Sequence, residues 1–344
     1  MSRSPLRVGI LGASFGGAVH APAFAAHEDF QVVAIASPNN AAEVARLRNI
    51  PAAYSSLEAM LAEAKLDVLS IAAPPFAHYQ AALAALKRGL HLVCEKPFTL
   101  TVAEAEELVS TAKTTGTACI IAHEFRFLPT RIALHELITN HHLGALREIE
   151  LVQQGGFLCS ESQRPRGWWF SREHGGGIAG AWLSHLIDAA TWLAGRPPLT
   201  SSGLMRTAVP GRYDTQGSFT SDVADGAFAL LDYGDGLIAR LCADGTLQVE
   251  ASTVAVHGSL RTAIASGTSI HAQQLFTIDA EEHAELEVRP IARPVLASIH
   301  ESVPAFTAML DAFSAAIEGQ PHHAASFEDG LVTQRVLASI GYGS

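Results

Sequence analysis

The segment that most constrains the fold is a short apolar run followed by a glycine-rich turn. Residues 7–11 predict a buried strand, and the residues from Ala18 onward predict a helix. The turn between them, Gly12-Ala13-Ser14-Phe15-Gly16-Gly17, has the spacing G-x-G-x-x-G, with Ser14 in place of the middle glycine. Gly12 permits a tight turn, and Gly17 lets helix and strand pack closely. Because N–H groups at a helix N-terminus can hold a pyrophosphate, this segment predicts a dinucleotide site.

The end of the next predicted strand bears on which dinucleotide is bound. Residues 31–36 predict a strand that ends at Ser37, 20 residues beyond Gly17. An acidic residue at this place would bind the ribose 2′-hydroxyl of NAD and repel the 2′-phosphate of NADP. Ser37 has no charge, so the sequence favours NADP and leaves NAD open.

Strands and helices alternate through the first third of the chain. Helices are predicted over residues 41–47, 57–63 and 78–88, and further strands over residues 67–72, 90–93 and 117–122. This order predicts a doubly wound parallel sheet with helices on both faces. One of these strands ends at Ala73-Pro74-Pro75. Pro74 and Pro75 shape the loop where a nicotinamide would lie, and His78 opens the helix that follows.

The run Cys94-Glu95-Lys96-Pro97 lies between a strand and a helix. The helix start, Thr101-Val102-Ala103-Glu104, has the form of a capping box. Open α/β sheets bind ligands at the carboxyl ends of their strands. Lys96 could there polarise a substrate oxygen or exchange a proton, with Glu95 orienting it. The alternative is a solvated lysine beside a turn-forming proline, since the tripeptide alone is common.

The pattern changes after residue 125, so we expect domains at residues 1–125 and 126–344, as the length of 344 residues also suggests. The second domain begins with a predicted helix, a strand and a polar loop over residues 154–174. Trp168 and Trp169 in this loop could form a stacking platform for a sugar or fill the core. A glycine run then opens a predicted helix over residues 178–194, which contains His185.

Predicted strands dominate the rest of the second domain. Residues 224–231 and 237–243 flank a hairpin turn, and a second hairpin follows at Gly258-Ser259. These strands predict a large, mostly antiparallel open sheet with one face on helices. The other face could be an oligomer interface, and we expect a homodimer or a homotetramer.

Several ordered motifs together resemble one family. They are Gly12…Ser14…Gly17…His20, Pro74…His78, Glu95-Lys96-Pro97 and Arg126-Phe127-x-Pro129. Over about residues 6 to 195 the chain is similar to the glucose–fructose oxidoreductase/inositol dehydrogenase (Gfo/Idh/MocA) family. The resemblance implies a Rossmann domain followed by an α/β domain, with Lys96 beside the nicotinamide and the reacting carbon. The expected dinucleotide contacts are Gly12, Ser14, Phe15, Gly16, Gly17, Ser37, Ala73, Pro74, His78, Glu95 and Lys96.

The same resemblance assigns a second catalytic residue and exposes a departure. The family pattern Gly-Gly-Gly…Asp-x-x-x-His places its histidine at His185, and its aspartate falls on Ala181. Alanine has no acid–base chemistry, so the family's proton relay cannot be transferred whole. Lys96 and His185 would bracket the reacting oxygen, and Arg126, Trp168 and Trp169 are candidates for the rim of the substrate pocket.

Composition excludes several other classes of function. The net charge of −11 argues against nucleic acid or an anionic membrane as the main partner. No apolar run reaches the roughly 18 residues of a membrane span. The four cysteines are scattered and the sixteen histidines dispersed, so no metal site is expected. The chain begins without a signal-peptide pattern, and we expect a cytoplasmic protein.

These observations predict an NAD(P)-dependent oxidoreductase that acts on a hydroxyl or carbonyl carbon of a small sugar, polyol or related compound. Two alternatives stay open. The fold also supports a non-catalytic dinucleotide-binding sensor, which the missing acid at position 181 favours and the intact Glu95-Lys96-Pro97 disfavours. It also supports a glycosidase with tightly held NAD, which predicts a cofactor retained through purification and no net NADH.

Overall fold

The computed structural model describes residues 4–162, 164–291 and 293–343, and these form two compact units. Unit 1 comprises Met1–Phe127 and Ile291–Leu331, and unit 2 comprises Leu128–Pro290 and Val332–Ser344. The sequence-based division places residues 291–331 with the second domain, whereas their contacts group them with the first. Residues 1–3, on which the expected absence of a leader rests, and Gln163 of the loop over residues 154–174 lie outside the described residues.

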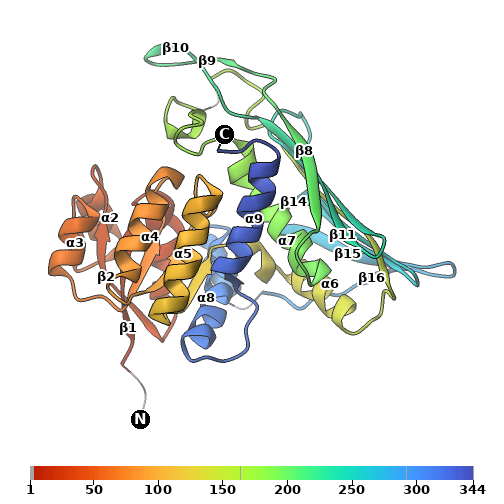
Figure 1. The fold of residues 1–344 in the computed structure, drawn as a ribbon, viewed down its shortest axis with the longest axis horizontal. Helices are drawn as coiled ribbons and strands as arrows, with labels where there is room; N and C mark the ends of the chain where they lie inside the picture. Colours follow the sequence, from red (N-terminus) through yellow and green to blue (C-terminus); the bar gives the residue numbers. More distant parts are fainter. Residues whose placement is uncertain (1–3, 163, 292, 344) are drawn as a thin grey trace. The chain divides into compact units, whose positions relative to one another are not determined.

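Unit 1 is built on a seven-stranded sheet, here sheet A, with the order β17-β6-β5-β4-β1-β2-β3 (Figure 1). All neighbouring strands are parallel except β17, which pairs antiparallel with β6. The predicted doubly wound parallel sheet is therefore confirmed. Its strands are β1 (Leu6–Leu11), β2 (Phe30–Ala36), β3 (Ala52–Tyr54), β4 (Val68–Ile71), β5 (His91–Cys94), β6 (Cys119–Ile121) and β17 (Ala325–Ser326).

Helices cover both faces of sheet A because each face presents a separate apolar layer. Phe24, Phe306 and Phe313 pack on one face, and Met60 and Leu108 on the other. The first layer holds the π-helical turn η1 (Gly16–His20), α1 (Ala21–Ala25), α2 (Ala41–Arg48) and α8 (Val303–Ile317). The second holds α3 (Leu57–Glu63), α4 (His78–Leu86), α5 (Val102–Thr115) and the start of α9 (Phe327–Ser339) (Figure 1).

The helix after Glu95-Lys96-Pro97 begins as its sequence predicts. Thr101 Oγ1 accepts a hydrogen bond from the Glu104 N–H at 3.3 Å, and Glu104 Oε2 accepts one from the Thr101 N–H at 3.1 Å. This capping box satisfies two backbone donors at the start of α5. It therefore fixes the chain a few residues beyond Lys96.

Unit 2 is built on an eight-stranded sheet, here sheet B, with the order β16-β15-β14-β13-β7-β12-β11-β8. Only β7 and β12 run parallel among its described strands, so the predicted mostly antiparallel sheet is confirmed. Its strands are β7 (Leu146–Gln154), β8 (Thr200–Arg206), β11 (Gly226–Gly234), β12 (Leu237–Asp244), β13 (Ala251–Gly258), β14 (Thr262–Ser269), β15 (Ala272–Ile278) and β16 (His283–Leu286). A separate hairpin joins β9 (Gly211–Asp214) to β10 (Gly217–Thr220).

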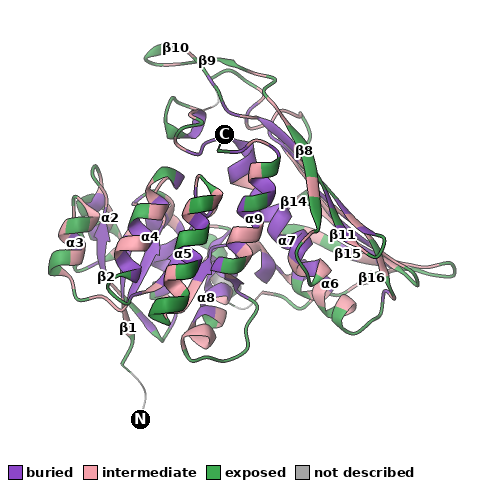
Figure 2. Cartoon of the chain, viewed as in Figure 1, coloured by how far each residue is buried: buried purple, intermediate pink, exposed green. Residues whose placement is uncertain are grey.

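One face of sheet B is buried and the other is open. Apolar side chains of α6 (Pro129–Thr139), α7 (Ser184–Ala194) and the end of α9 pack against the buried face. On the open face, Leu204 of β8 and Leu230 of β11 are exposed. Figure 2 shows β8 as exposed and half-buried along its length. The alternation of buried and exposed positions along β11 is the pattern of a sheet covered on one side.

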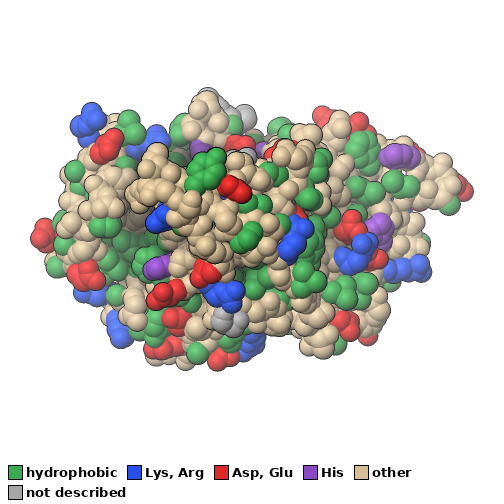
Figure 3. All heavy atoms as spheres, turned by 90° about the horizontal axis from the view of Figure 1, so that it is seen from above, with side chains coloured by type: hydrophobic (Ala, Val, Ile, Leu, Met, Phe, Trp, Pro, Cys, Tyr) green, Lys and Arg blue, Asp and Glu red, His purple; other side chains and the backbone are tan. Residues whose placement is uncertain are grey.

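The surface is mixed in charge. On the face that Figure 3 presents, Lys and Arg side chains are interspersed with Asp and Glu side chains. Such interspersed charges are typical of a solvated protein surface. Among the described helices, none is both long enough and apolar enough to cross a membrane.

Candidate functional site

The turn after β1 requires glycine at its first position. Gly12 has a φ of +102°, and its N–H donates to the Ala36 carbonyl oxygen at 2.9 Å. A Cβ atom on this residue would lie 2.3 Å from the Ala72 carbonyl oxygen and 2.8 Å from the Ala73 nitrogen. The ends of β1 and β4 therefore approach so closely that no side chain fits between them.

The close packing expected of Gly17 falls instead on Gly16. A Cβ on Gly16 would lie 2.9 Å from Cγ2 of Ile10 on β1, so this residue brings the helix against the strand. A Cβ on Gly17 would lie 2.6 Å from Cγ1 of Val44, which belongs to α2. The expected helix–strand role of Gly17 is corrected to a helix–helix contact. The helical turn also begins at residue 16 and is π-helical, two residues before the expected start.

The turn offers what a dinucleotide phosphate needs. Ser14 is exposed and Phe15 half-buried, so the outside of the turn carries only one small and one aromatic side chain. The first N–H groups of a helix have no partner within the helix, and together they favour an anion. These residues fit the pyrophosphate of a dinucleotide.

A buried polar chain lies behind Lys96. His20 is fully buried, with Nδ1 at 2.7 Å from Ser70 Oγ and Nε2 at 3.2 Å from Glu95 Oε1. Burial raises the pKa of Glu95, but the hydrogen bond from His20 and the charge of Lys96 outweigh it, and the net pKa is lowered. Glu95 is therefore an anion, and its Oε2 accepts the Lys96 N–H at 3.3 Å. His20 and Ser70 were not assigned to the site from the sequence, although His20 lies in the first motif.

His78 joins two of the predicted cofactor segments. Its Nδ1 lies 2.9 Å from the Pro97 carbonyl oxygen, and its Nε2 lies 2.8 Å from the Ala73 carbonyl oxygen. Burial lowers the pKa of His78 and favours the neutral ring. Because a neutral imidazole has one N–H, it donates to one of these carbonyls at a time. His78 thus holds the loop after β4 against the loop after β5. Lys96, which precedes Pro97 in the loop after β5, is half-buried.

The residues after β2 are held by local hydrogen bonds. Ser37 Oγ donates to Asn40 Oδ1 at 2.9 Å. Arg48 donates from Nε to the Gly17 carbonyl oxygen at 2.8 Å. The end of α2 is thereby tied to the glycine turn. Gly12, Ser37, Ala73 and Lys96 follow the carboxyl ends of β1, β2, β4 and β5, so unit 1 gathers the predicted dinucleotide residues at one edge of sheet A.

The short helix η3 (Glu124–Phe127) follows β6 and carries two buried charged residues. Arg126 is 4% exposed, pairs with Asp329 at 3.5 Å and donates to the His323 carbonyl oxygen at 3.2 Å. It is buried within unit 1, and its predicted contact with substrate stays a prediction. Glu124 is 3% exposed, and burial raises its pKa to about 8. Glu124 was not among the predicted site residues.

The predicted site residues of unit 2 differ in exposure. Trp169 and His185 are buried, whereas Trp168 is 39% exposed. Phe157 and Phe170 pack edge-on against the Trp169 ring, so Trp169 is a core residue and Trp168 is the better stacking candidate. Both tryptophans belong to the 3-10 turn η4 (Trp168–Phe170).

The helix that bears His185 is not uniformly α-helical. Its first five residues form the π-helical turn η5 (Ala179–Leu183), and α7 begins only at Ser184. The prediction of one continuous α-helix over residues 178–194 is therefore corrected.

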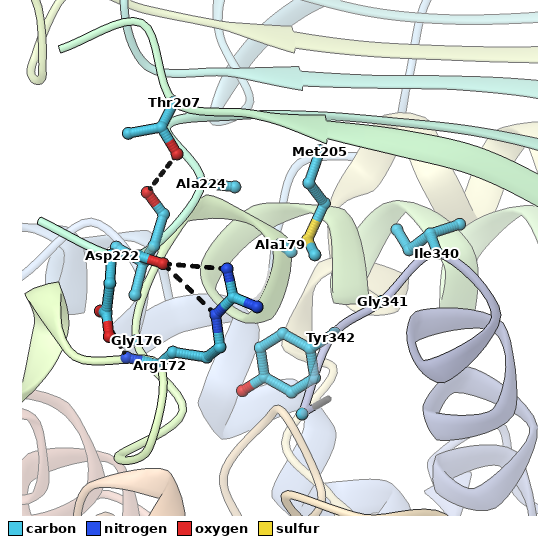
Figure 4. A pocket seen from close by; sticks show the side chains of 12 residues that line it. Arg172, Gly176, Ala179, Met205, Thr207, Asp222, Ala224, Ile340, Gly341 and Tyr342 are labelled. Carbon is cyan, nitrogen blue, oxygen red and sulfur yellow. Dashed lines mark hydrogen bonds between the residues drawn. The ribbon is translucent and has the colours of Figure 1, made fainter. Parts of the chain in front are cut away.

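Unit 2 also contains a cavity of about 280 Å³. Arg172 crosses one side of it, donating from Nε and Nη2 to the Asp222 carbonyl oxygen at 3.4 and 3.3 Å (Figure 4). Tyr342 lines another side, and its hydroxyl donates to the Gly175 carbonyl oxygen at 2.9 Å. Both sets of hydrogen bonds join residues of unit 2, so they hold the segment from Arg172 to Gly175 in place. Within the described residues, no three His, Cys, Asp or Glu side chains gather as ligands for a metal ion.

Two family models match the chain. Residues 6–123 match an oxidoreductase family with an NAD-binding Rossmann fold, and residues 132–264 match the GFO/IDH/MocA C-terminal domain. The two matches cover unit 1 through β6 and most of sheet B. They agree with the family that the sequence motifs indicated.

Known proteins resemble the chain over most of its length. It is 27% identical to the D-glucoside 3-dehydrogenase of Escherichia coli over 359 residues, covering 99% of this chain and 95% of that protein. It is 36% identical to an uncharacterized oxidoreductase of Synechocystis over 219 residues, covering 62% of this chain and 58% of that protein. A levoglucosan dehydrogenase solved with NADH shares the fold, with a TM-score of 0.86, 22% identity and coverage of 98% of this chain and 96% of that one. The chain belongs to the Gfo/Idh/MocA family of oxidoreductases, with an NAD-binding Rossmann domain at its N-terminus.

Proposed function

We propose that this protein is an NAD(P)-dependent dehydrogenase that acts on a secondary hydroxyl group of a sugar, a polyol or a related compound. The observation that supports this best is the buried chain from Ser70 through His20, at the end of the helical turn η1, to Glu95, which accepts the backbone N–H of Lys96. A protein that only binds a dinucleotide has no need of such a chain. Relatives named D-glucoside 3-dehydrogenase and levoglucosan dehydrogenase support the substrate class.

The residues of unit 1 divide into binding and chemical roles. The turn from Gly12 to Gly17 holds the pyrophosphate, and the loop at Ala73 and Pro74 supports the nicotinamide. A bound nicotinamide dinucleotide supplies the acceptor for a hydride. The Lys96 ammonium stabilises the charge that develops on the substrate oxygen, and the Glu95 carboxylate holds the lysine in place. His185 takes part in moving the alcohol proton, and Trp168 presents a face on which a sugar ring can stack.

A substrate panel tests the function directly. Sugars, polyols and their oxidised forms are offered with NAD and with NADP, and reduced nicotinamide is followed by its absorbance. We expect at least one pyranose or cyclic polyol to give stoichiometric reduction. A tightly retained cofactor with glycoside cleavage and no net NADH would instead identify a glycosidase. A wild-type protein that binds dinucleotide and turns over nothing would identify a sensor.

The choice of dinucleotide is set after β2. We propose that NADP is accepted, because Ser37 adds no negative charge where the 2′-phosphate would lie. Ser37→Asp should weaken NADPH binding on the order of tenfold or more by charge repulsion and leave NADH binding nearly unchanged. Titration of both reduced dinucleotides measures this, with Ser110→Asp on α5 as the control of equal charge. A wild-type protein that ignores NADPH would contradict the proposal.

His185 is proposed to help move the alcohol proton at the substrate end of the site, because an imidazole nitrogen can both accept and donate a proton. His185→Asn should keep the fold and the dinucleotide affinity and flatten the acidic limb of the pH–rate profile. His142→Asn, on an exposed turn, is the matched control. If His185→Asn keeps the wild-type profile from acid to alkaline pH, the histidine is a core residue.

We also propose that the protein is a homo-oligomer in the cytoplasm. The open face of sheet B supports this assembly, because it exposes Leu204 and Leu230 on neighbouring strands β8 and β11. A second copy placed on this face would bury both leucines, as an isologous interface does.

A further inference from the structure

Glu124 is a buried carboxyl with an unmet hydrogen-bonding capacity. It is 3% exposed, and its Oε2 atom is buried without a hydrogen-bond partner in the described part of the chain. Leaving a buried polar atom without a partner is costly, and native proteins seldom do so without a reason. The Oε2 atom is therefore available to receive a proton.

Sheet A places Glu124 close to the proposed catalytic lysine. Strands β5 and β6 are parallel neighbours in which Cys94 pairs with Ile121, and the Ala122 N–H donates to the Cys94 carbonyl oxygen at 2.8 Å. Lys96 is two residues beyond the end of β5, and Glu124 is three residues beyond the end of β6. Both chains thus leave the sheet at the same edge, where open α/β sheets bind ligands.

Among the charged groups around Glu124, Lys96 is the cation that acts on it. Arg126 on the same short helix is paired with Asp329. On α8, which packs against this helix, Asp311 is the charged residue, and it is engaged by His27 and Arg293. The other titratable groups at this edge of sheet A are His20, His78, Glu95 and Lys96. His123 precedes Glu124 in the chain, and His322 and His323 lie near Arg126.

We propose that Glu124 stores the proton of the reaction, as a positioning residue that receives it through the ammonium group of Lys96. This inference rests on the dehydrogenase function proposed above. During oxidation, the C–H bond of the alcohol carbon breaks and its hydride would go to the nicotinamide. The O–H bond breaks as well, and its proton passes to Lys96 as Lys96 passes one of its own to the Glu124 carboxylate. Lys96 keeps three N–H bonds, and Glu124 becomes a neutral carboxylic acid. Reduction runs the same transfer backward.

The electrostatics of the site agree with this role. Burial and the Glu95 charge raise the pKa of Glu124, the Lys96 charge lowers it in part, and the net pKa is about 8. An exposed glutamate titrates at about 4.3 and stays ionised at neutral pH. Glu124 instead changes its charge near the pH at which an enzyme works, as a proton-exchanging group should.

The first experiment needs no substrate. Infrared spectra of the protein are recorded from pH 5 to 10, and the carbonyl stretch of protonated carboxyl groups is followed. The wild type should show such a band at pH 6 that is lost as the pH rises through about 8. Glu124→Gln should lack the band, and Glu107→Gln, which removes an exposed carboxyl of α5, should keep it. A wild-type protein without this band at pH 6 would overturn the proposal.

The second experiment follows turnover of the panel substrate against pH. Wild-type oxidation should rise as the pH passes about 8. Glu124→Gln should lose this rise and be slower by about a hundredfold at pH 9, with unchanged dinucleotide affinity. Glu124→Asp, which keeps the carboxyl, should restore part of the rise, and it takes over the test if Glu124→Gln does not fold.

The outcomes separate the two proposals. If the wild type turns over a sugar and both Glu124 variants keep its pH profile, the proton-storing role is wrong and the dehydrogenase function stands. If the wild type binds dinucleotide but turns over no member of the panel, the function itself fails and this inference falls with it, whatever the infrared band does.

Discussion

Replacing Lys96 by methionine should lower turnover about a hundredfold to a thousandfold while leaving dinucleotide affinity nearly intact. The lysine follows the carboxyl end of β5, and its backbone N–H is held by the buried Glu95 carboxylate. The proposed role of its ammonium is to stabilise the developing alkoxide, which is an interaction of the transition state rather than of the bound cofactor. Methionine keeps the length and apolar stem of lysine and removes only the charge.

The measurement is steady-state kinetics on the panel substrate together with titration of NADH and NADPH. Lys87→Met, on the exposed end of α4, is the matched control and should change neither quantity. A variant at position 96 that loses binding and turnover to the same extent would identify a structural lysine instead.

The local sequence of unit 1 predicted most of the strands of its sheet, because these strands are apolar runs between turn signals. The parallel pairing followed from the alternation of strands and helices. The short strand β3 was not predicted, since none of its three residues is buried. The place of helix α8 does not follow from its sequence, because its apolar face shows only that it packs against another part of the protein. Phe306 and Phe313 pack on sheet A, so a segment far along the chain belongs to unit 1. The two residues of β17 are too short for any periodic signal.

The helices at residues 16 and 179 departed from expectation for a different reason. Both begin with a π-helical turn, whose i to i+5 bonding leaves no trace in an apolar pattern of period 3.6. The strand β8 was missed because its residues are mostly exposed or half-buried and do not alternate. The hairpin of β9 and β10 is polar, and its strands carry no apolar face either.

The residues of the candidate site that belong to sequence motifs could be predicted. Gly12, Glu95 and Lys96 stand out by their spacing and flanking elements. Glu124 does not, since one glutamate in the run His123-Glu124-Phe125 resembles any surface glutamate until its burial is known. Its missing partner is a tertiary property, created by the packing of its short helix against α8. Arg126 is the opposite case. It stands out in a sequence motif, but its guanidinium forms an ion pair with Asp329 within unit 1.

Replacing Gly12 by valine should abolish dinucleotide binding. The residue has a φ of +102°, which a β-branched side chain does not tolerate, and its Cβ would lie 2.3 Å from the Ala72 carbonyl oxygen. The backbone must therefore move at the end of β1 and at Ala72-Ala73, the two segments proposed to hold the pyrophosphate and the nicotinamide. Titration of NADH and NADPH measures the loss, and circular dichroism checks that the sheet persists.

Gly89→Val separates strain from steric block. Gly89 also has a positive φ, of +70°, but a Cβ there would meet nothing within 4 Å. Valine at position 89 should cost stability of about 1–3 kcal/mol through backbone strain and leave binding intact. If Gly12→Val binds both dinucleotides as the wild type does, the turn after β1 is not the phosphate site. If Gly89→Val loses binding as fully as Gly12→Val, general destabilisation rather than the turn explains the loss.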